Sequence, residues 1–242
     1  MATTTKTVLF LGASTGVGLS ALKHTLSAGH RCIALCRVPS KLTAIFPPGA
    51  NPNIKIIQGN AHDLTAVSKS LLAESGNLVD EIVSTIGGAF NSKMAMDQPD
   101  ICGKGMKVLL EALAQLRSDG VIGNPHIVVC GTTGMSRFGR DVPLPMVPVY
   151  SLLLKGPIKD KKVMEALLID SGESYTIVHA SHLTTGETSK EVRVGIDDPK
   201  TGREVTAIGY AISREDAGKW IAHHLVLQLD GKYVNKIVGV TN

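Results

Sequence analysis

The sequence has few aromatic residues, little charge and no long apolar run. Aromatic side chains make up 4% and charged side chains 19% of its 242 residues, against a hydrophobic share of 43%. This composition is typical of a globular chain and excludes disorder for most of it. No apolar stretch reaches the ~18 residues that a membrane span requires. The longest candidate, residues 142–154, is interrupted by Pro143, Pro145 and Pro148.

Basic blocks, paired cysteines and a secretion signal are also missing. The formal charge of +4 is spread along the chain, which argues against nucleic acid or an anionic membrane as a partner and fits a small anionic ligand. Four cysteines lie in or beside apolar runs without C-x-x-C spacing, so we expect reduced, buried thiols and no metal site. The N-terminus passes directly into a predicted strand, so we expect a soluble cytoplasmic protein.

Short apolar runs alternate along the chain with segments of helical periodicity. Runs that are apolar at successive positions predict strands buried on both faces, as in a parallel sheet. The series predicts a doubly wound, Rossmann-type α/β fold in a single domain over residues 1–242. The predicted strands are 7–11, 31–36, 53–58, 81–86, 126–130 and 175–179, and the main predicted helices are 18–29, 64–72, 102–116 and 159–170.

The alternation weakens beyond residue 180. Residues 191–213 read as a hairpin-like excursion around the turn at 197–202, and Ser213 with Asp216 predicts the capped start of a closing helix over 214–227. Residues 135–158 combine prolines with two methionines, Phe138 and Tyr150. We interpret the segments at about 136–160 and 183–213 as a small cap over an apolar or aromatic substrate, although a subunit contact would also explain the first. The oligomeric state cannot be predicted from these residues.

The segment VLFLGASTGVGLSAL places a glycine loop between a buried strand and an amphipathic helix. In this context Gly12 allows a tight turn, Gly16 lets the backbone approach a pyrophosphate, and Gly18 lets the helix pack closely on the strand. The loop residues Ser14, Thr15 and Val17 complete the predicted cofactor contact, to which the two hydroxyl groups can add donors. A glycine-rich turn that binds nothing is the alternative.

Basic residues follow the second predicted strand at the position that distinguishes NAD from NADP. Arg37 and Lys41 stand there, and no Asp or Glu occurs from His30 to Ile57. An acidic residue would accept a hydrogen bond from a ribose 2′-hydroxyl, whereas Arg accommodates a 2′-phosphate. The sequence therefore predicts NADP(H) as cofactor, with a pair of solvated cations as the alternative.

Several segments together resemble the atypical branch of the short-chain dehydrogenase/reductase superfamily, close to its NmrA-like and flavin-reductase-like NAD(P)-binding members. They include LGASTGVG, CRVPSKL, QGNAHD, STIGG, VVCGTTG and ISREDAGKW, and the likeness covers nearly the whole chain. Members of this branch reduce flavins, quinones or other conjugated compounds, and others only sense a dinucleotide. The resemblance implies Asn60 and Ala61 beside the adenine, with Asn60 replacing the usual Asp, and Ile86, Gly87 and Gly88 along the ribose and nicotinamide.

The same resemblance implies Thr133 after the fifth strand and His182 after the sixth as site residues. The usual superfamily mechanism needs a Tyr four residues before a Lys. Alignment on Glu165 puts that lysine at Lys161 and the tyrosine position at Pro157, so the dyad is missing. Tyr150 with Lys155 is an alternative whose spacing is five residues, ahead of Gly156 and Pro157. A proton would then come from Thr133, His182 or solvent.

These observations lead to three hypotheses. The first is an NADPH-dependent oxidoreductase that transfers hydride to a small apolar or conjugated substrate such as a flavin, quinone, enone or polyketide-like compound. The second is an NADP(H)-binding regulator without catalysis, which the missing tyrosine favours. The third is a redox-silent cyclase, isomerase or dehydratase on the same fold.

Overall fold

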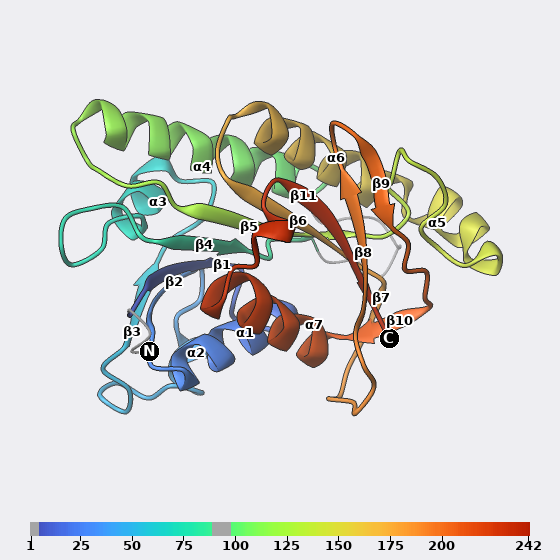
Figure 1. Cartoon of the computed structure of the whole chain (residues 1–242). Helices are drawn as coiled ribbons and strands as arrows, with labels where there is room; N and C mark the ends of the chain where they lie inside the picture. Colours follow the sequence, from blue (N-terminus) through green and yellow to red (C-terminus); the bar gives the residue numbers. More distant parts are fainter. Residues whose placement is uncertain (1–4, 89–97) are drawn as a thin grey trace.

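The computed structural model describes residues 5–88 and 98–242. A nine-stranded sheet runs through the molecule in the order β3-β2-β1-β4-β5-β6-β11-β8-β9, and β10 and β7 form a separate two-stranded sheet (Figure 1). The strands are β1 Thr7–Leu11, β2 Arg31–Cys36, β3 Ile54–Gln58, β4 Glu81–Ser84, β5 His126–Thr132, β6 Tyr175–Ala180, β7 His182–Thr184, β8 Arg193–Asp198, β9 Gly202–Val205, β10 Ala211–Ser213 and β11 Lys236–Thr241.

Helices cover both faces of the large sheet. In Figure 1, α1, α2 and α7 lie on one face, and α3, α4 and α6 lie on the other. The helices are α1 Gly16–Ser27, α2 Ser40–Thr43, α3 Leu64–Ser70, α4 Ile101–Ser118, α5 Val147–Leu153, α6 Lys155–Asp170 and α7 Arg214–Ile221. Two 3₁₀ turns, Leu144–Met146 and Gly231–Tyr233, and a π-helical segment, Ala222–Leu227, complete the set.

The apolar run of β1 feeds two separate cores because successive strand residues point to opposite faces. Val8 and Phe10 pack with α1 and α7 on one side. Leu9 and Leu11 pack with α4 and α6 on the other. All four side chains are at most 1% exposed, which explains why the strand is apolar at successive positions rather than at alternate ones.

The first six strands confirm the predicted fold class. They pair in parallel in the order β3-β2-β1-β4-β5-β6. The chain order reverses between β1 and β4, and ligands of open α/β sheets bind outside the carboxyl ends of the strands at such a point. The glycine loop leaves β1 at this place.

The sheet continues beyond β6 with strands that the sequence predicted only in part. The last strand, β11, pairs in parallel with β6 and was not predicted. The predicted hairpin-like excursion is confirmed as the antiparallel pair β8 and β9, which extends the sheet beyond β11. The sheet is therefore mixed at this edge rather than parallel throughout.

Helix boundaries also differ from the expected ones. Helix α6 begins at Lys155 instead of residue 159, because Gly156 and Pro157 fall in its first turn, where a missing N–H costs nothing. Residues 144–153, expected to be irregular, form a 3₁₀ turn and α5. Ser213 caps α7 as predicted, its Oγ accepting from the Asp216 N–H at 2.9 Å, but the helix turns into the π-helical segment at Ala222.

All four cysteines are free and buried, as predicted. Burial raises the pKa of the Cys102 thiol to about 12, so at neutral pH it is protonated and a poor nucleophile.

Candidate functional site

The loop between β1 and α1 is built around three glycines. Gly12 and Gly16 have positive φ angles of 84° and 60°, a region that glycine enters without strain. A Cβ on Gly18 would lie 2.3 Å from Thr85 Oγ1 and 2.9 Å from the Gly12 carbonyl oxygen. No larger residue fits where α1 packs against β1 and the end of β4, so the loop brings bare backbone to the edge of the sheet.

The first turn of α1 leaves donors open to a ligand. Its N-cap residue, Thr15, makes no side-chain hydrogen bond to the helix, and Thr15 is exposed while Ser14 is half-buried. The first N–H groups of a helix have no partner within it and favour an anion. Val17 is buried and anchors the turn in the core. The loop therefore fits the pyrophosphate of a dinucleotide.

Arg37 and Lys41 lie where the sequence predicts a 2′-phosphate contact. Arg37 directly follows β2, and Lys41 belongs to the short helix α2. Both side chains are exposed, and neither takes part in an ion pair within residues 5–88 and 98–242. Two unpaired cations beside the end of β2 fit an added phosphate group.

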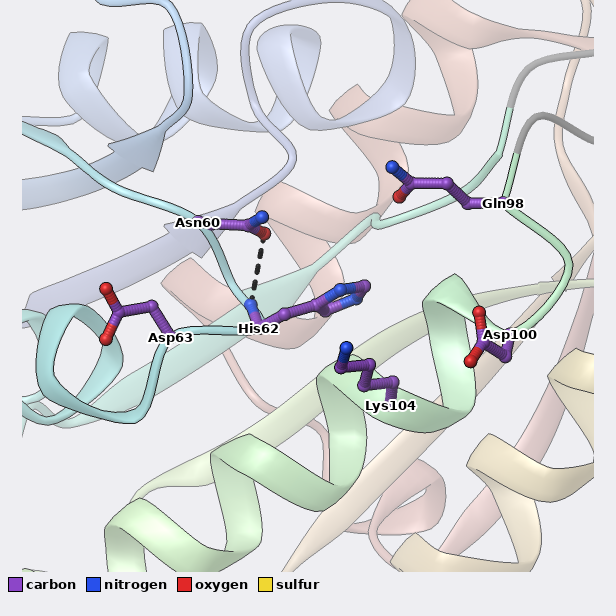
Figure 2. Close-up of a pocket in the computed structure, with 6 residues that line it drawn as sticks. All are labelled: Asn60, His62, Asp63, Gln98, Asp100 and Lys104. Carbon is purple, nitrogen blue, oxygen red and sulfur yellow. Dashed lines mark hydrogen bonds between the residues drawn. The ribbon is translucent and has the colours of Figure 1, made fainter.

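A cavity of about 600 Å³ opens beyond β3, at the predicted adenine position. Figure 2 shows Asn60, His62 and Asp63 on one side of it, with Lys104 and Asp100 from the region of α4 opposite. Asn60 Oδ1 accepts from the His62 N–H at 3.1 Å, and His62 Nε2 lies 2.9 Å from the Ile101 carbonyl oxygen, to which it can donate. Asn60 lies in the lining of this cavity and Ala61 does not, and the contact of either residue with an adenine stays a prediction. Among the residues that the structure describes, the lining is Asn60, His62, Asp63, Gln98, Asp100 and Lys104.

The segment after β4 runs beside the glycine loop. The Ile86 nitrogen lies 3.0 Å from the position that a Cβ on Gly12 would occupy. Gly87 has open space on the side where a Cβ would stand, and Gly88 follows as a half-buried residue. Ile86 therefore lies beside the glycine loop, and Gly87 and Gly88 follow it in the chain; a contact of these three residues with the ribose and nicotinamide stays a prediction from the resemblance.

A tyrosine and a threonine meet at the carboxyl end of β5. The Thr133 hydroxyl donates to Tyr150 Oη at 3.2 Å, and the two residues are 5% and 6% exposed. Gly134, with a φ of 84°, makes room for the ring, because a Cβ there would lie 2.5 Å from Tyr150 Cδ1. The sequence suggests Lys155 as the partner of Tyr150, whereas the structure pairs Tyr150 with Thr133.

Lys161 reaches the same strand from α6. Its Nζ donates to the Cys130 carbonyl oxygen at 2.8 Å. Burial raises the pKa of the Cys130 thiol, and the positive charge of Lys161 opposes that rise. Lys161 is therefore an interior cation close to the end of β5, and the structure anchors it on the backbone without a hydrogen bond to Tyr150.

An arginine from β9 ties down the loop that follows Thr133. Arg203 donates to Ser136 Oγ at 2.8 Å, to the Arg140 carbonyl oxygen at 2.9 Å, and to Asp197 Oδ1 at 2.8 Å. Hydrogen bonds from Arg203 and Ser136 lower the pKa of Asp197 against the opposing effect of burial. The cavity on the side of Thr133 that faces this group measures about 20 Å³, which is room for a water molecule.

The two histidines after Val178 have different surroundings. His182 begins β7 and is exposed, and it makes no hydrogen bond or ion pair to Thr133 or Lys161 in the described ranges. His179 is buried on β6, with Nε2 2.7 Å from Glu165 Oε1. The structure therefore brings Thr133 and Lys161 to one strand end but leaves His182 outside that cluster.

Two residues of the candidate site, Thr85 and Arg214, were not predicted from the sequence. Thr85 donates from Oγ1 to the Gly12 carbonyl oxygen at 3.1 Å and fixes the glycine loop to the end of β4. Arg214, at the start of α7, packs its side chain against Gly16. Both stand in segments that carried the family resemblance, STIGG and ISREDAGKW. Their position after a strand and at a helix start was the available signal.

The sheet order, the glycine loop and the basic residues after β2 define a dinucleotide-binding protein of the Rossmann type. The chain belongs to the NAD(P)H-binding family, whose model matches residues 12–226. Its cofactor is a nicotinamide dinucleotide. Two similar proteins are reductase pytE of Aspergillus terreus, 35% identical over the full length of both chains, and oxidase pynE of Aspergillus niger, 31% identical over 97% of this chain and 98% of the relative.

Solved structures share the fold at low identity. A short-chain dehydrogenase/reductase from Veillonella parvula, in complex with NADP, superposes with a TM-score of 0.68 at 16% identity and covers 98% of this chain and 94% of that one. This neighbour confirms the predicted Rossmann-type fold.

Two other kinds of site find no support in residues 5–88 and 98–242. None of the helices there combines the length and the apolar character needed to cross a membrane. No group of three or more potential metal ligands occurs there either.

Proposed function

We propose that this chain is a cytoplasmic NADPH-dependent reductase of a small apolar or conjugated compound, such as a flavin, quinone, enone or polyketide-like carbonyl. The observation that carries the proposal is the hydrogen bond of 3.2 Å between Thr133 and Tyr150 at the end of β5. The pair places two hydroxyl groups at the carboxyl end of a strand, where substrates of this fold bind. A relative is named a reductase and another an oxidase, which supports a redox reaction.

Four groups of residues would form the cofactor half of the site. The loop from Gly12 to Gly18 would hold the pyrophosphate, Arg37 and Lys41 would hold the 2′-phosphate, and Asn60 would face the adenine. Bound there, the reduced nicotinamide supplies the hydride. Residues 86–88 would border the ribose and nicotinamide.

The chain's own residues would handle the proton. When Thr133 donates to Tyr150 Oη, the hydrogen of the phenol is free to reach a substrate oxygen. The positive charge of Lys161 near the end of β5 would stabilise the negative charge that develops on the substrate oxygen during hydride transfer. His182, which is exposed, is the second possible proton donor. Residues 136–160 and 183–213 would cap the substrate, and the exposed apolar side chains of Leu144 and Leu152 favour an apolar one.

Turnover of NADPH with a panel of flavins, quinones and enones tests the proposal, followed by the loss of absorbance of the reduced nicotinamide. Tyr150→Phe and Thr133→Val should each lower kcat by about 10²-fold, in the range of positioned proton transfer, with an unchanged Kd for NADPH. Tyr175→Phe is the matched control, because Tyr175 is 6% exposed like Tyr150 but begins β6, at the opposite end of the sheet. His182→Ala measures the alternative donor. Tight NADPH binding without oxidation by any acceptor would instead support the non-catalytic regulator.

Cofactor choice has its own test by titration. Arg37→Gln and Lys41→Gln should each raise the Kd for NADPH by about tenfold or more, the value of a lost charge-assisted hydrogen bond, and leave the Kd for NADH unchanged. Equal affinities of the wild-type protein for NADPH and NADH would contradict the preference for NADPH.

A further inference from the structure

Arg214 lies against the glycine loop although almost the whole chain separates the two. It is the first residue of α7. Its Cδ is 3.2 Å and its Nε 3.8 Å from the position that a Cβ on Gly16 would occupy. Because Gly16 has no side chain, the arginine stem covers its α-carbon directly. The side chain of Arg214 thus lies against the loop between β1 and α1, although Arg214 itself belongs to α7.

Close packing between α1 and α7 fixes this placement. The two helices lie side by side in Figure 1. Ser20 Oγ donates to the Glu215 carbonyl oxygen at 2.7 Å. A Cβ on Gly218 would lie 2.4 Å from the Val17 carbonyl oxygen, so the two backbones touch with no side chain between them. The start of α7 cannot move away from the start of α1 without breaking this contact.

Only part of the guanidinium is used by the protein. Nη1 donates to the carbonyl oxygens of Leu183 and Thr184, both at 3.0 Å, which ties the end of β7 to Arg214. Nη2 and Nε have no acceptor among the residues that the structure describes. The group therefore keeps unused donors on a side chain that is only half exposed.

Arg214 also has no counter-ion, even though two acidic residues follow it. Glu215 Oε2 accepts from the Gly186 N–H at 3.0 Å, and Asp216 accepts from Thr188 Oγ1 at 2.7 Å. Neither forms an ion pair with Arg214 in the part of the chain described. A half-buried guanidinium that keeps free donors is suited to bind an anion beside it. The uncapped first turn of α1 next to it also favours an anion.

We propose that Arg214 is a pyrophosphate-binding residue of the cofactor site. It supplies the side-chain charge that the glycine loop, made of backbone donors, lacks. Through its bonds to Leu183 and Thr184 it also connects the cofactor to β7, the strand that His182 begins. The proposal rests on the cofactor half of the proposed function and is independent of whether a substrate is reduced.

Two probes that differ in the pyrophosphate separate this role from others. NADP⁺ carries both the pyrophosphate and the 2′-phosphate, whereas adenosine 2′-monophosphate carries only the latter. Arg214→Gln should raise the Kd for NADP⁺ by about tenfold or more, as expected for a lost charge-assisted hydrogen bond, and change that for adenosine 2′-monophosphate by less than about twofold. Arg37→Gln is the matched control, which should weaken both probes. If wild-type protein binds NADP⁺ and NAD⁺ equally, the 2′-phosphate adds no affinity. Adenosine then takes the place of adenosine 2′-monophosphate as the second probe.

A purely structural role for Arg214 would give a different pattern. If Arg214→Gln weakens both probes equally, or neither, the proposal is wrong. Arg214→Lys keeps the charge and most of the stem, and is measured in the same way if the Gln variant does not fold, as judged by circular dichroism. An intact NADP⁺ effect in a protein that turns over no acceptor would overturn the proposed reductase and leave the role of Arg214 standing.

Discussion

At the scale of single residues, the position of Tyr150 depends on the absence of a side chain at Gly134. The tyrosine ring occupies the space next to the Gly134 α-carbon, and the φ of 84° there is one that other residues rarely adopt. The hydroxyl contact with Thr133 is therefore set by a glycine that itself has no chemistry. This gives a way to displace the phenol without altering it.

Gly134→Ala should separate Tyr150 from Thr133, because the new methyl group would lie 2.5 Å from Tyr150 Cδ1. We expect a loss of about 1–3 kcal/mol in the free energy of unfolding and a fall in kcat similar to that of Tyr150→Phe. Gly139→Ala is the control: its φ is also positive, at 113°, but the nearest atom to its Cβ is Arg203 Nη1 at 3.5 Å. Urea unfolding and steady-state turnover measure both. Equal losses of kcat in the two variants would mean that backbone strain, and not the ring contact, is responsible.

The site residues that could be predicted are those that local sequence specifies. Gly12, Gly16 and Gly18 follow from one strand–turn–helix pattern, and Arg37 from the end of the next strand. The Thr133–Tyr150 pair could not be predicted, because it depends on the path of residues 134–149, which no periodicity describes. Arg214 was missed for a similar reason, since its contact with Gly16 exists only once α7 has packed on α1.

At the scale of elements, the contact between α1 and α7 links the last helix to the cofactor loop. Gly218 lets the two helices approach, and its Cβ would lie 2.4 Å from the Val17 carbonyl oxygen and 2.5 Å from Ser20 Cβ. Both atoms belong to the first turns of α1, directly after the glycine loop. A change in the spacing of the helices therefore reaches the loop itself.

Gly218→Ala should lower the free energy of unfolding by about 1–3 kcal/mol, in the range of overpacking in a core, and also weaken NADPH binding. Gly156→Ala is the matched control, a helical glycine in α6 with no atom within 4 Å of its Cβ position. There the better helix propensity of alanine should raise stability by about 0.5–1 kcal/mol without changing the Kd. Urea unfolding and cofactor titration measure the two effects. A Gly218→Ala protein as stable as wild type would contradict the close contact.

Secondary structure was predicted well where several turns or strands repeat one pattern, and poorly at the edges of the sheet. The six parallel strands can be predicted as runs that are apolar at successive positions, because helices cover both faces of the sheet. β11 was not predicted, because Gly239 interrupts its apolar run and the strand follows a break in the alternation. The π-helical segment at Ala222–Leu227 keeps helical periodicity in the sequence, so nothing local distinguishes it from a continuation of α7.

At the scale of the whole molecule, the cofactor loop and the Thr133–Tyr150 pair lie at the carboxyl ends of the strands, and a buried polar group lies at the opposite ends. Glu81 begins β4 beside His126, which begins β5. Lys6 Nζ donates to Glu81 Oε1 at 3.0 Å and to the Val226 carbonyl oxygen at 2.6 Å. Glu81 Oε2 is buried without a hydrogen-bond partner in the described structure. Glu81 and His126 are therefore titratable groups at the end of the sheet opposite the Thr133–Tyr150 pair.

The two titratable groups shift in opposite directions. Burial raises the pKa of Glu81 from 4.5 to about 7, although Lys6 opposes the rise. Its contribution to stability is thus fully present below about pH 4.5 and is lost as the pH rises through 7. Burial lowers the pKa of His126 from 6.5 to about 4. Its contribution is present above about pH 6.5 and is lost as the pH falls through 4. In the wild-type protein the two dependences partly cancel between pH 4.5 and 6.5.

Glu81→Gln should remove the pH dependence of stability that Glu81 contributes and leave that of His126, because the glutamine side chain does not titrate. The stability of the variant relative to wild type should rise between pH 4.5 and 7.5 by up to about 3 kcal/mol, since each unit of pKa shift is worth about 1.4 kcal/mol. Glu74→Gln is the matched control: its side chain is 75% exposed in a pair with Arg31, so its difference from wild type should vary by less than about 1 kcal/mol. Urea unfolding at several pH values measures both. If the curve for Glu81→Gln runs parallel to that of wild type, the carboxyl titrates alike in the folded and unfolded chains, and burial at this end of the sheet does not hold its proton.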